Sequence, residues 1–411
     1  MKNNLKPISF IIPSRNNLKY LKQAYESIRK NQSVEHEICI ADDFSDDGTM
    51  EWVLVQMKRD KNIKFHRNQG PERLGHTILY DTLINEYATH DRVMIFHADM
   101  YLCPRADESI DRLLEPKSVV SLTRIEPPLH PEGPEKILKD FGIEPEEFKE
   151  EESLKFLSEE VHYDKGRGIV TEGIFAPWVI LKEDWDFIGG HDPLFAPQSK
   201  EDSDIFNRFE LAGFKFKQTW DGFVYHMTCR GSRFKDGAKR NPNGEVFMKG
   251  RESDEWLTQN HKSTREFIRK WGHFVQHDEM MKPIVPPKYD IGFVVYNCTK
   301  HLLSELEPWC NKLYLDLKDS NLIGDYVSDE QKITSYDLGE RVKLYGTSKI
   351  SELHDICIEF DASRLTNESI QVITNLSSII QDSGEVGEME YDIFKFYINK
   401  LDTYEKDLIQ L

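Results

Sequence analysis

The first half of the chain alternates short apolar runs with amphipathic segments. The apolar runs are rich in β-branched residues and predict strands at 8–13, 37–41, 63–66 and 92–97. Helical periodicity between them predicts helices at 19–30, 49–58 and 77–87. Strands that alternate with helices are typical of an α/β fold with a mainly parallel sheet. Ligands of such sheets bind at the carboxyl ends of the strands, so we expect the site among the polar residues that follow these runs.

The pattern changes at residues 125–168. This segment contains several prolines and an acidic stretch at 144–160, which predicts a solvated helical insertion rather than an acidic binding tail. The alternation of strands and helices returns at Ile169, and a polar helix at 252–271 closes the unit. This last helix carries an aromatic stripe that we expect in the core, formed by Trp256, Phe267 and Trp271.

A second domain is predicted after a proline-bearing segment at 281–288, which we interpret as a stiff linker. The expected division is therefore a first domain at 1–280 and a small accessory α/β domain at 289–411. In the accessory domain the pattern predicts a helix at 368–380 and strands at 291–296, 313–317, 341–345, 355–360 and 389–397. No group of catalytic residue types stands out there.

Composition narrows the class of protein. Of 411 residues, 39% are hydrophobic and 30% charged, which is typical of soluble globular proteins. The formal net charge of -19 argues against nucleic acid as a partner and against docking on anionic lipid, but it allows a local basic pocket for phosphate. No run approaches the roughly 20 apolar residues of a membrane span, and the N-terminal run is interpreted as a strand, not a signal peptide. The six scattered cysteines predict reduced thiols and a cytoplasmic location.

The strongest candidate site follows the strand at 37–41. Asp42 and Asp43 lie at its carboxyl end, and an Asp-rich turn then opens a helix. Helix capping explains Asp46 or Asp47 well. It explains the first two acids poorly, because they lie where ligands of parallel sheets bind.

Two later segments add further acids. The strand at 92–97 runs into His97 and Asp99, which are two residues apart and can converge on a metal ion or a hydroxyl. Three acids, Glu201, Asp202 and Asp204, open a helix. The helix dipole accounts for one acid in a first turn, so one of the three is a candidate base.

A further segment combines a histidine with cations. His226 follows a strand-like run, and a buried structural histidine is the alternative interpretation. The cations beyond it predict a pocket for an anionic ligand such as phosphate, and they are Arg230, Arg233, Lys235, Lys239 and Arg240.

In this order, the elements resemble those of family 2 glycosyltransferases with the GT-A fold. The most specific are the start at 11–16 (IIPSRN) and the element at 42–49 (DDFSDDGT), followed by the histidine and acids named above. The resemblance covers residues 5 to 275. It implies a Rossmann-like catalytic domain that transfers a sugar from a nucleotide-sugar donor, with UDP favoured, to a carbohydrate or other hydroxyl acceptor in polysaccharide biosynthesis.

The resemblance also implies roles for matching residues. The donor-binding set is Pro13, Arg15, Asp42, Asp43, Arg73, Gly75, His97, Ala98, Arg230 and Arg233. Asp99 and His226 would bind Mn²⁺ or Mg²⁺, and Asp202, with Glu201 beside it, would be the general base of an inverting reaction. The acceptor-side set is Gly173, Trp185, His191 and Asp192. His97 departs from the family, which has an aspartate there.

Two other functions stay open at this point. A sugar nucleotidyltransferase normally needs a glycine-rich phosphate loop, whereas residues 13–17 contain no glycine. A non-catalytic carbohydrate- or partner-binding protein on a GT-A fold is compatible with His97 but disfavoured by the retained Asp99, Asp202 and His226. Self-association into a homo-oligomer is an additional open alternative.

Overall fold

The structure of the chain is a computed structural model that describes residues 5–162, 168–228, 235–248 and 252–411. It divides into two compact units. The first comprises Met1–Gln259, His277–Pro283 and Leu411, and the second comprises Asn260–Gln276 and Ile284–Gln410. The predicted linker at 281–288 contains no helix or strand. The division between the units instead falls within helix α8 (Asp254–Trp271), and residues 277–283 group with the first unit.

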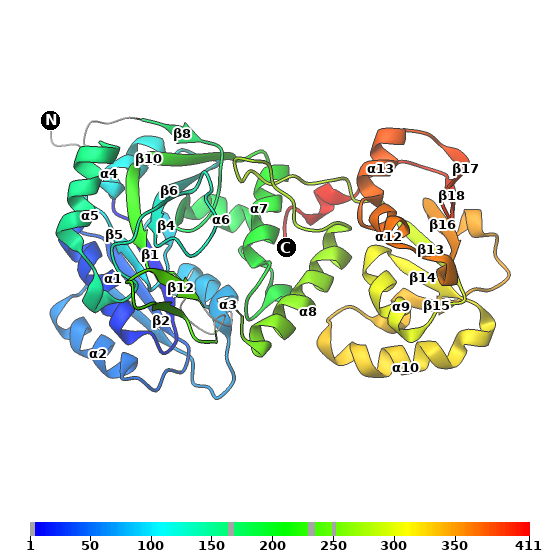
Figure 1. Ribbon diagram of the computed structural model, residues 1–411, viewed down its shortest axis with the longest axis horizontal. Coiled ribbons are helices and arrows are strands. Elements are labelled where there is room, and N and C mark those ends of the chain that lie inside the picture. The colour runs from blue at the N-terminus through cyan, green and yellow to red at the C-terminus, as the bar shows by residue number, and fades with distance from the viewer. Residues whose placement is uncertain (1–4, 163–167, 229–234, 249–251) are drawn as a thin grey trace. The chain divides into compact units, whose positions relative to one another are not determined.

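The first unit is built around a ten-stranded sheet (Figure 1). Its main path follows the order β3-β2-β1-β4-β9-β6-β10-β5, with β7 beside β6 and β8 beside β10. The strands are β1 (Ser9–Ser14), β2 (Glu37–Asp42), β3 (Ile63–Arg67), β4 (Arg92–Ile95), β5 (Met100–Leu102), β6 (Ser118–Glu126), β7 (Lys136–Leu138), β8 (Val170–Thr171), β9 (Trp178–Leu181) and β10 (Lys215–His226). Strands β3, β2, β1 and β4 run parallel, as do β6 and β10, which confirms the predicted mainly parallel sheet.

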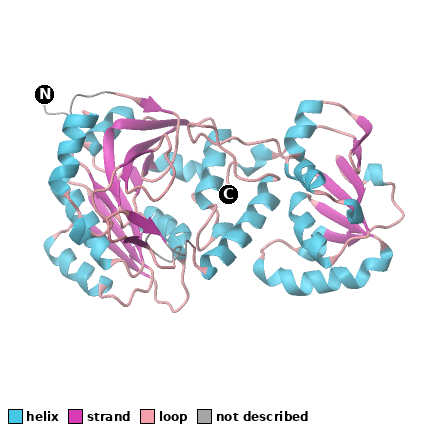
Figure 2. Cartoon of the chain, viewed as in Figure 1, coloured by secondary structure: helices cyan, strands magenta, loops and turns pink. Residues whose placement is uncertain are grey.

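Helices flank the strands of this sheet, as Figure 2 shows. They are α1 (Leu18–Asn31), α2 (Thr49–Arg59), α3 (Gly75–Thr82), α4 (Ala106–Leu113), α5 (Glu150–Phe156), α6 (Lys182–Ile188) and α7 (Glu201–Leu211). The buried positions of α1 include Leu21, Ala24 and Ile28, at the three- and four-residue spacing of an amphipathic helix. Asp47 accepts hydrogen bonds from the amides of Leu18 at 2.8 Å and Thr49 at 3.2 Å, so one carboxylate serves the starts of both α1 and α2.

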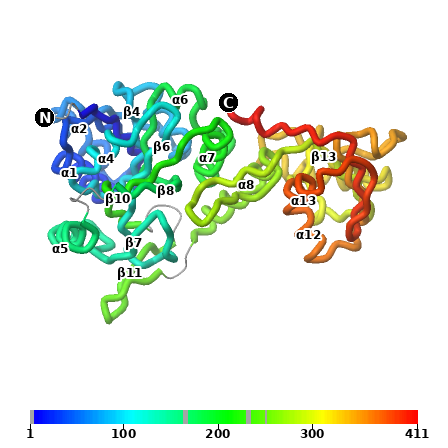
Figure 3. Tube along the Cα trace, turned by 90° about the horizontal axis from the view of Figure 1, so that it is seen from above, coloured from blue at the N-terminus to red at the C-terminus, as the bar shows by residue number. Residues whose placement is uncertain are grey.

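The predicted solvated insertion is partly core. Helix α5 and the π-helical turn Leu157–Val161 bury Leu157 against an aromatic cluster that includes Phe141 and Tyr225. The sequence pattern missed this because the outward acids of α5 dominate its composition. Strand β11 (Ala238–Arg240) pairs with β12 (Val246–Met248) in a hairpin. In Figure 3, β11 lies on the same side of the first unit as α5 and β7.

The second unit contains a six-stranded sheet in the order β15-β14-β13-β16-β18-β17. Its strands are β13 (Ile291–Tyr296), β14 (Lys312–Leu315), β15 (Val342–Leu344), β16 (Ile356–Asp361), β17 (Gly387–Tyr391) and β18 (Phe394–Ile398). Its helices are α9 (Lys300–Leu306), α10 (Ser320–Glu330), α11 (Leu338–Arg341), α12 (Asn367–Thr374) and α13 (Leu376–Ser383). The single strand predicted at 389–397 is wrong, because β17 and β18 form a hairpin around Asp392, whose φ is 55°.

The aromatic stripe of α8 lies as predicted, with Phe267 and Trp271 buried and Trp256 half-buried. The same helix contributes Ile268 to the hydrophobic core of the second unit. Among the residues that the structure describes, no helix is long and apolar enough to cross a membrane.

Candidate functional site

The carboxyl ends of the parallel strands bring together residues that are distant in sequence. The register of β1, β2 and β3 places Ser14 beside Asp42 and Asp42 beside Arg67. Asp42 is fully buried, forms an ion pair with Arg67, and accepts a hydrogen bond from the Ser45 amide at 2.9 Å. Protein groups therefore already surround this carboxylate, and its predicted role in donor binding stays a prediction.

Phe44, the residue after this acid pair, has a strained backbone. Its φ is 59°, which is unusual for a bulky residue, and its side chain is 40% exposed. The ring lies over Gly70, where a Cβ atom would come within 2.4 Å of it, and the Arg67 guanidinium carbon lies 5.7 Å from the ring centroid. This exposed ring directly follows Asp42 and Asp43, two residues of the predicted donor-binding set, and strained backbone of this kind is common at functional sites.

Asp43 organises the loop that leads into α3. Its carboxylate accepts hydrogen bonds from the Asn68 side chain at 2.7 Å, the Leu74 amide at 3.1 Å and the Gly75 amide at 2.9 Å. Arg73 in this loop lies 3.8 Å from Asp43. The acid therefore fixes the loop and, through it, the position of a guanidinium.

Gly75 has to be glycine for packing reasons. Its φ is +76°, and a Cβ atom there would lie 2.0 Å from the Pro197 carbonyl oxygen. Arg73 also donates to Gln198 Oε1 at 2.7 Å. These contacts place the predicted donor loop against the segment that precedes α7.

Three side chains could hold a metal ion. One ligand atom each of His97, Asp99 and His226 lies within 4.8 Å of the others. Glu126, at the end of β6, lies 2.8 Å from His226 Nδ1, which leaves Nε2 of the same ring 3.4 Å from Asp99. A carboxylate that holds the outer nitrogen of a histidine is the usual support of a metal ligand.

The charges in this cluster fit a metal site. Burial lowers the pKa of His97 to about 3, helped by the nearby His226, so this imidazole is neutral and able to coordinate. Burial disfavours the charged form of His226, but Asp99 and Glu126 outweigh it and raise its pKa to about 9. A bound ion would take the place of the proton that His226 shares with Asp99.

Helix α7 presents two acids with different surroundings. Glu201 lies 2.5 Å from His76 Nε2, and this histidine holds the pKa of Glu201 below its usual value despite burial. Asp202 forms no hydrogen bond or ion pair with the part of the chain that the structure describes. Burial and the Glu201 charge raise the pKa of Asp202 to about 6, so its carboxylate is free to accept a proton.

The charges of Asp202 and of Asp99, a member of the candidate metal cluster, both act on Tyr80. Burial raises the pKa of its phenol well above the usual value, and the charges of Asp202, Glu201 and Asp99 raise it further. The phenol therefore lies within electrostatic reach of both the candidate base and a candidate metal ligand. Neither Tyr80 nor Glu126 nor His76 was predicted from the sequence. The strand-terminal position of Glu126 was the available signal, and the other two carried none.

The predicted acceptor-side residues are mainly structural neighbours of this site. Trp185 and His191 are only 1% and 3% exposed, and His191 Nδ1 lies 2.7 Å from Asp81. Asp192 caps the short turn after it by accepting from the Leu194 amide. A Cβ atom on Gly173 would lie 2.6 Å from the Met280 carbonyl oxygen, so this glycine allows two backbones to approach.

The predicted cations are only partly brought together. Arg15 is exposed and lies close enough to Arg73 to lower the pKa of that guanidinium, beyond the larger effect of burial. Pro13 is half-buried and Ala98 buried at the strand ends. Arg230 and Arg233 lie outside the described residues. Arg240 forms ion pairs with Asp140 and Glu147 at 2.7 and 2.9 Å, and its predicted part in binding an anion stays a prediction.

A family model described as Glycosyl transferase family 2 matches residues 9–158. This part of the chain is a family 2 glycosyltransferase domain. The match begins with β1 and ends in the turn after α5, so it includes Asp42, Asp43, Asp99 and Glu126. The prediction of a GT-A α/β fold for this glycosyltransferase domain is confirmed.

Solved structures similar to the chain share little sequence with it. GalNAc-T7 with UDP, GalNAc and Mn²⁺ is 13% identical, with 55% of this chain and 44% of that chain covered and a TM-score of 0.41. The mannosyltransferase PcManGT from Pyrobaculum calidifontis with GDP-Man and Mn²⁺ is 16% identical, with 56% and 59% covered and a TM-score of 0.39. Residues 1–349 of S. aureus TarS with UDP are 15% identical, with 53% and 60% covered and a TM-score of 0.38. The matches thus span about half of each of these structures, and no curated protein matches the chain.

Proposed function

We propose that the chain transfers a sugar from a nucleotide-sugar donor, with UDP as the preferred nucleotide, to a hydroxyl acceptor with inversion at the anomeric carbon. The observations that support this proposal are the Tyr80 ring, whose centroid lies 5.8 Å from that of His76, the partner of Glu201, and the charges of Asp202 and Asp99, which add to the effect of burial and raise the pKa of the Tyr80 phenol. A carboxylate without an ion pair among the described residues and a candidate metal cluster therefore support the proposal, in a chain whose residues 9–158 match the family 2 glycosyltransferase model. A cytoplasmic role in polysaccharide biosynthesis is part of the proposal and rests on the resemblance and the cysteine pattern.

Asp202 is the proposed base. It takes the proton of the acceptor hydroxyl while that oxygen bonds to the anomeric carbon and the bond from this carbon to the diphosphate breaks. A single displacement of this kind inverts the configuration. Proton transfer to a positioned base contributes about 10²–10⁴-fold to the rate. The raised pKa of Asp202, about 6, leaves it ionised at neutral pH while keeping it a better base than an ordinary aspartate.

Cationic groups and a metal ion would balance the charge of the diphosphate. Arg15 and Arg73 are the proposed partners of its oxygens, since the charge of Arg15 acts on Arg73 and lowers the pKa of that guanidinium, beyond the larger effect of burial. His97, Asp99 and His226 would hold a divalent ion, which when bound stabilises negative charge on the leaving diphosphate. Two imidazoles among three ligands fit Mn²⁺ better than Mg²⁺, which prefers oxygen ligands.

The experiment that tests the function uses the full chain with a panel of UDP- and GDP-sugars, Mn²⁺ and oligosaccharide acceptors. We expect release of the nucleoside diphosphate with one donor, and loss of release in EDTA and in Asp99→Ala. Asp186→Ala, which removes an exposed acid of α6, is the matched control. Full activity in EDTA and in Asp99→Ala would show that no metal site of this kind operates.

The same panel, extended with nucleoside triphosphates and sugar 1-phosphates, separates the two alternatives. A sugar nucleotidyltransferase would form a nucleotide-sugar and pyrophosphate from a nucleoside triphosphate and a sugar 1-phosphate. A non-catalytic protein would bind a nucleotide-sugar in calorimetry without releasing a diphosphate. Either result would overturn the proposed transfer.

A further inference from the structure

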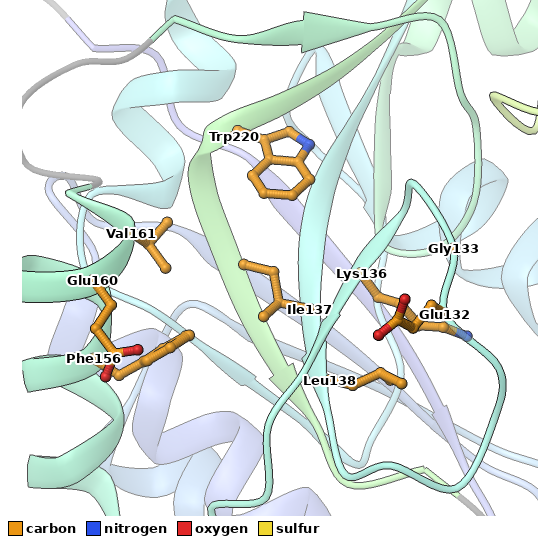
Figure 4. Close-up of a pocket in the computed structure, with 9 residues that line it drawn as sticks. All are labelled: Glu132, Gly133, Lys136, Ile137, Leu138, Phe156, Glu160, Val161 and Trp220. Carbon is orange, nitrogen blue, oxygen red and sulfur yellow. The ribbon is translucent and has the colours of Figure 1, made fainter.

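The first unit contains a cavity outside the candidate site. Its volume is about 510 Å³, within the range of about 300–1,000 Å³ that is usual for small-ligand pockets. Strand β7, the end of the α5 segment and the bend of β10 form its walls (Figure 4). None of the residues that line it belongs to the proposed donor, metal or base groups.

An irregularity in β10 presents an aromatic ring to this cavity. The ladder between β10 and β6 pairs Thr219 with Leu122 and then Phe223 with Thr123, so Trp220 lies on a bulge outside the pairing. Bulges of this kind redirect a side chain away from the regular sheet. Trp220 lines the cavity, as Figure 4 shows.

The bulge is held in place by specific contacts. The Trp220 amide donates to the Ile169 carbonyl at 2.9 Å, and Asp221 accepts from the Gly168 amide at 2.8 Å. A Cβ atom on Gly222 would lie 2.2 Å from Ser109 Oγ, so only glycine lets the backbone turn inward there. The indole is thus positioned by the fold rather than left on a free loop.

The rest of the lining combines apolar surface with exposed carboxylates. Phe156 and Ile137 lie on the same cavity as Trp220, and in Figure 4 the carboxyl groups of Glu160 and Glu132 lie on either side of Ile137. Neither acid forms an ion pair with the part of the chain that is described. An aromatic face with hydrogen-bond acceptors beside it suits a neutral ligand that has both C–H faces and hydroxyl groups.

The positive charge of Lys136 does not alter the preference for a neutral ligand. Lys136 also lines the cavity, but its Nζ lies 3.1 Å from Glu135 and 3.7 Å from Glu126, so its charge is balanced inside the protein. Lys139 lies beside the cavity, with its Nζ 5.1 Å from the centroid of the Phe156 ring. Among the described residues that line the cavity, Glu132 and Glu160 are the charged groups without an ion pair, so the net charge is negative and an anionic ligand such as a phosphate or a sugar nucleotide is disfavoured.

We propose that this cavity binds a neutral oligosaccharide of hexopyranose units, with a sugar ring against Trp220 and its hydroxyls donating to Glu132 or Glu160. The choice of a carbohydrate among neutral hydroxylated ligands rests on the proposed function. The site would hold part of the acceptor chain apart from the sugar that reacts. Such a second contact raises the effective concentration of the reacting end at the donor site.

The test measures binding directly, without donor or metal. The full chain is titrated by calorimetry with cellohexaose, chitohexaose, maltohexaose and mannohexaose. We expect at least one of them to bind, Trp220→Ala to weaken that binding by about tenfold or more, and Trp220→Phe to keep most of it, because a ring remains. Phe247→Ala, which removes an exposed ring that does not line the cavity, and Asp202→Asn should bind like the native chain.

Two results would overturn the proposal. One is the absence of binding of all four oligosaccharides at millimolar concentration, and the other is native affinity in a folded Trp220→Ala chain. Binding that UDP or Asp202→Asn abolishes would place the sugar in the reaction centre, against this cavity but in favour of the proposed function. Trp220-dependent binding in a chain without transferase activity would instead count against the proposed function alone.

Discussion

Asp202 differs from its neighbour Glu201 by one contact. His76 pairs with Glu201 and leaves Asp202 without a partner among the described residues, and this difference supports the proposal that Asp202 is the base. The family resemblance implied Asp202 as the base, but the residue pattern alone did not separate it from Glu201, because His76 reaches α7 from a helix start more than a hundred residues earlier. Asp42 shows the opposite outcome, since Arg67 from the neighbouring strand already pairs with it.

The pH dependence of transfer tests this assignment. Asp202 must be ionised to act as a base, so kcat/KM should rise with pH through about 6 and level off above it. Glu201→Gln removes a charge that raises this pKa, and we expect the rising limb to move to lower pH.

Two measurements complete that test. Asp202→Asn should lower kcat by about 10²–10⁴-fold while calorimetry finds nearly native donor affinity. A limb that stays in place in Glu201→Gln, or a loss of donor binding in Asp202→Asn, would show that Asp202 is not the base.

Asp43 makes a prediction about donor affinity. Asp43→Ala removes three hydrogen bonds from the loop that carries Arg73, so we expect about tenfold weaker binding of the nucleotide-sugar and a loss of about 1–3 kcal/mol in the free energy of unfolding. Asp46→Ala in the same turn removes an exposed acid and should change neither quantity. Equal effects of the two substitutions would contradict the assigned role of Asp43.

For the helices and strands, the pattern of hydrophobic and polar residues along the chain was sufficient to predict most elements of the first unit. It failed where the chain reverses within an apolar run. Residues 389–397 have a continuous strand-like composition, yet Asp392 turns the chain and produces two paired strands. The predicted helix at 368–380 likewise ends at Thr374, and a second helix starts at Leu376.

Four elements of the second unit meet at one buried carboxylate. Glu307 lies 2.7 Å from an Arg269 nitrogen, forms an ion pair with Arg341, and accepts a hydrogen bond from Tyr326 at 3.0 Å. Burial would raise the pKa of Glu307, but the two guanidiniums outweigh it and lower this pKa from 4.5 to about 2. The ion pairs of Glu307 with the two arginines therefore stabilise the fold above pH 4.5, and this contribution to the free energy of unfolding is lost as pH falls toward 2.

Urea unfolding of Glu307→Gln measures that contribution. At neutral pH we expect the free energy of unfolding to fall by about 3–5 kcal/mol, because two guanidiniums lose their buried partner. The difference between native chain and variant should shrink as the pH is lowered through 4.5. Glu305→Gln on the exposed side of α9 is the control and should unfold like the native chain at every pH. A constant difference across that range would show that the ion pair is not its source.

For the whole molecule, the sequence predicted two α/β domains but not which residues belong to each. Proline content marked 281–288 as a linker, whereas long-range contacts assign 260–276 to the second unit and 277–283 to the first. No local signal encodes these contacts. For the same reason, the order of the strands in each sheet could not be predicted from the residue pattern.

A shortened chain tests where the donor site lies. All described donor, metal and base candidates precede residue 260, so we expect a chain that ends at Lys282 to bind the nucleotide-sugar with native affinity. Ile268 loses its hydrophobic core in that chain, so the companion variant Ile268→Gln should be more soluble. A soluble shortened chain without donor affinity would place part of the donor site in the second unit.

The contact between Phe44 and Gly70 has a consequence for inheritance. A ring at position 44 occupies the space that a Cβ atom at position 70 would need, so a side chain at 70 first requires a smaller residue at 44, and the φ of +60° disfavours that side chain even then. Among descendants of a common ancestor, a small residue at 44 should come first and a side chain at 70 only afterwards. Lineages that keep an aromatic residue at 44 should therefore keep glycine at 70, and the two columns of a family alignment should vary together.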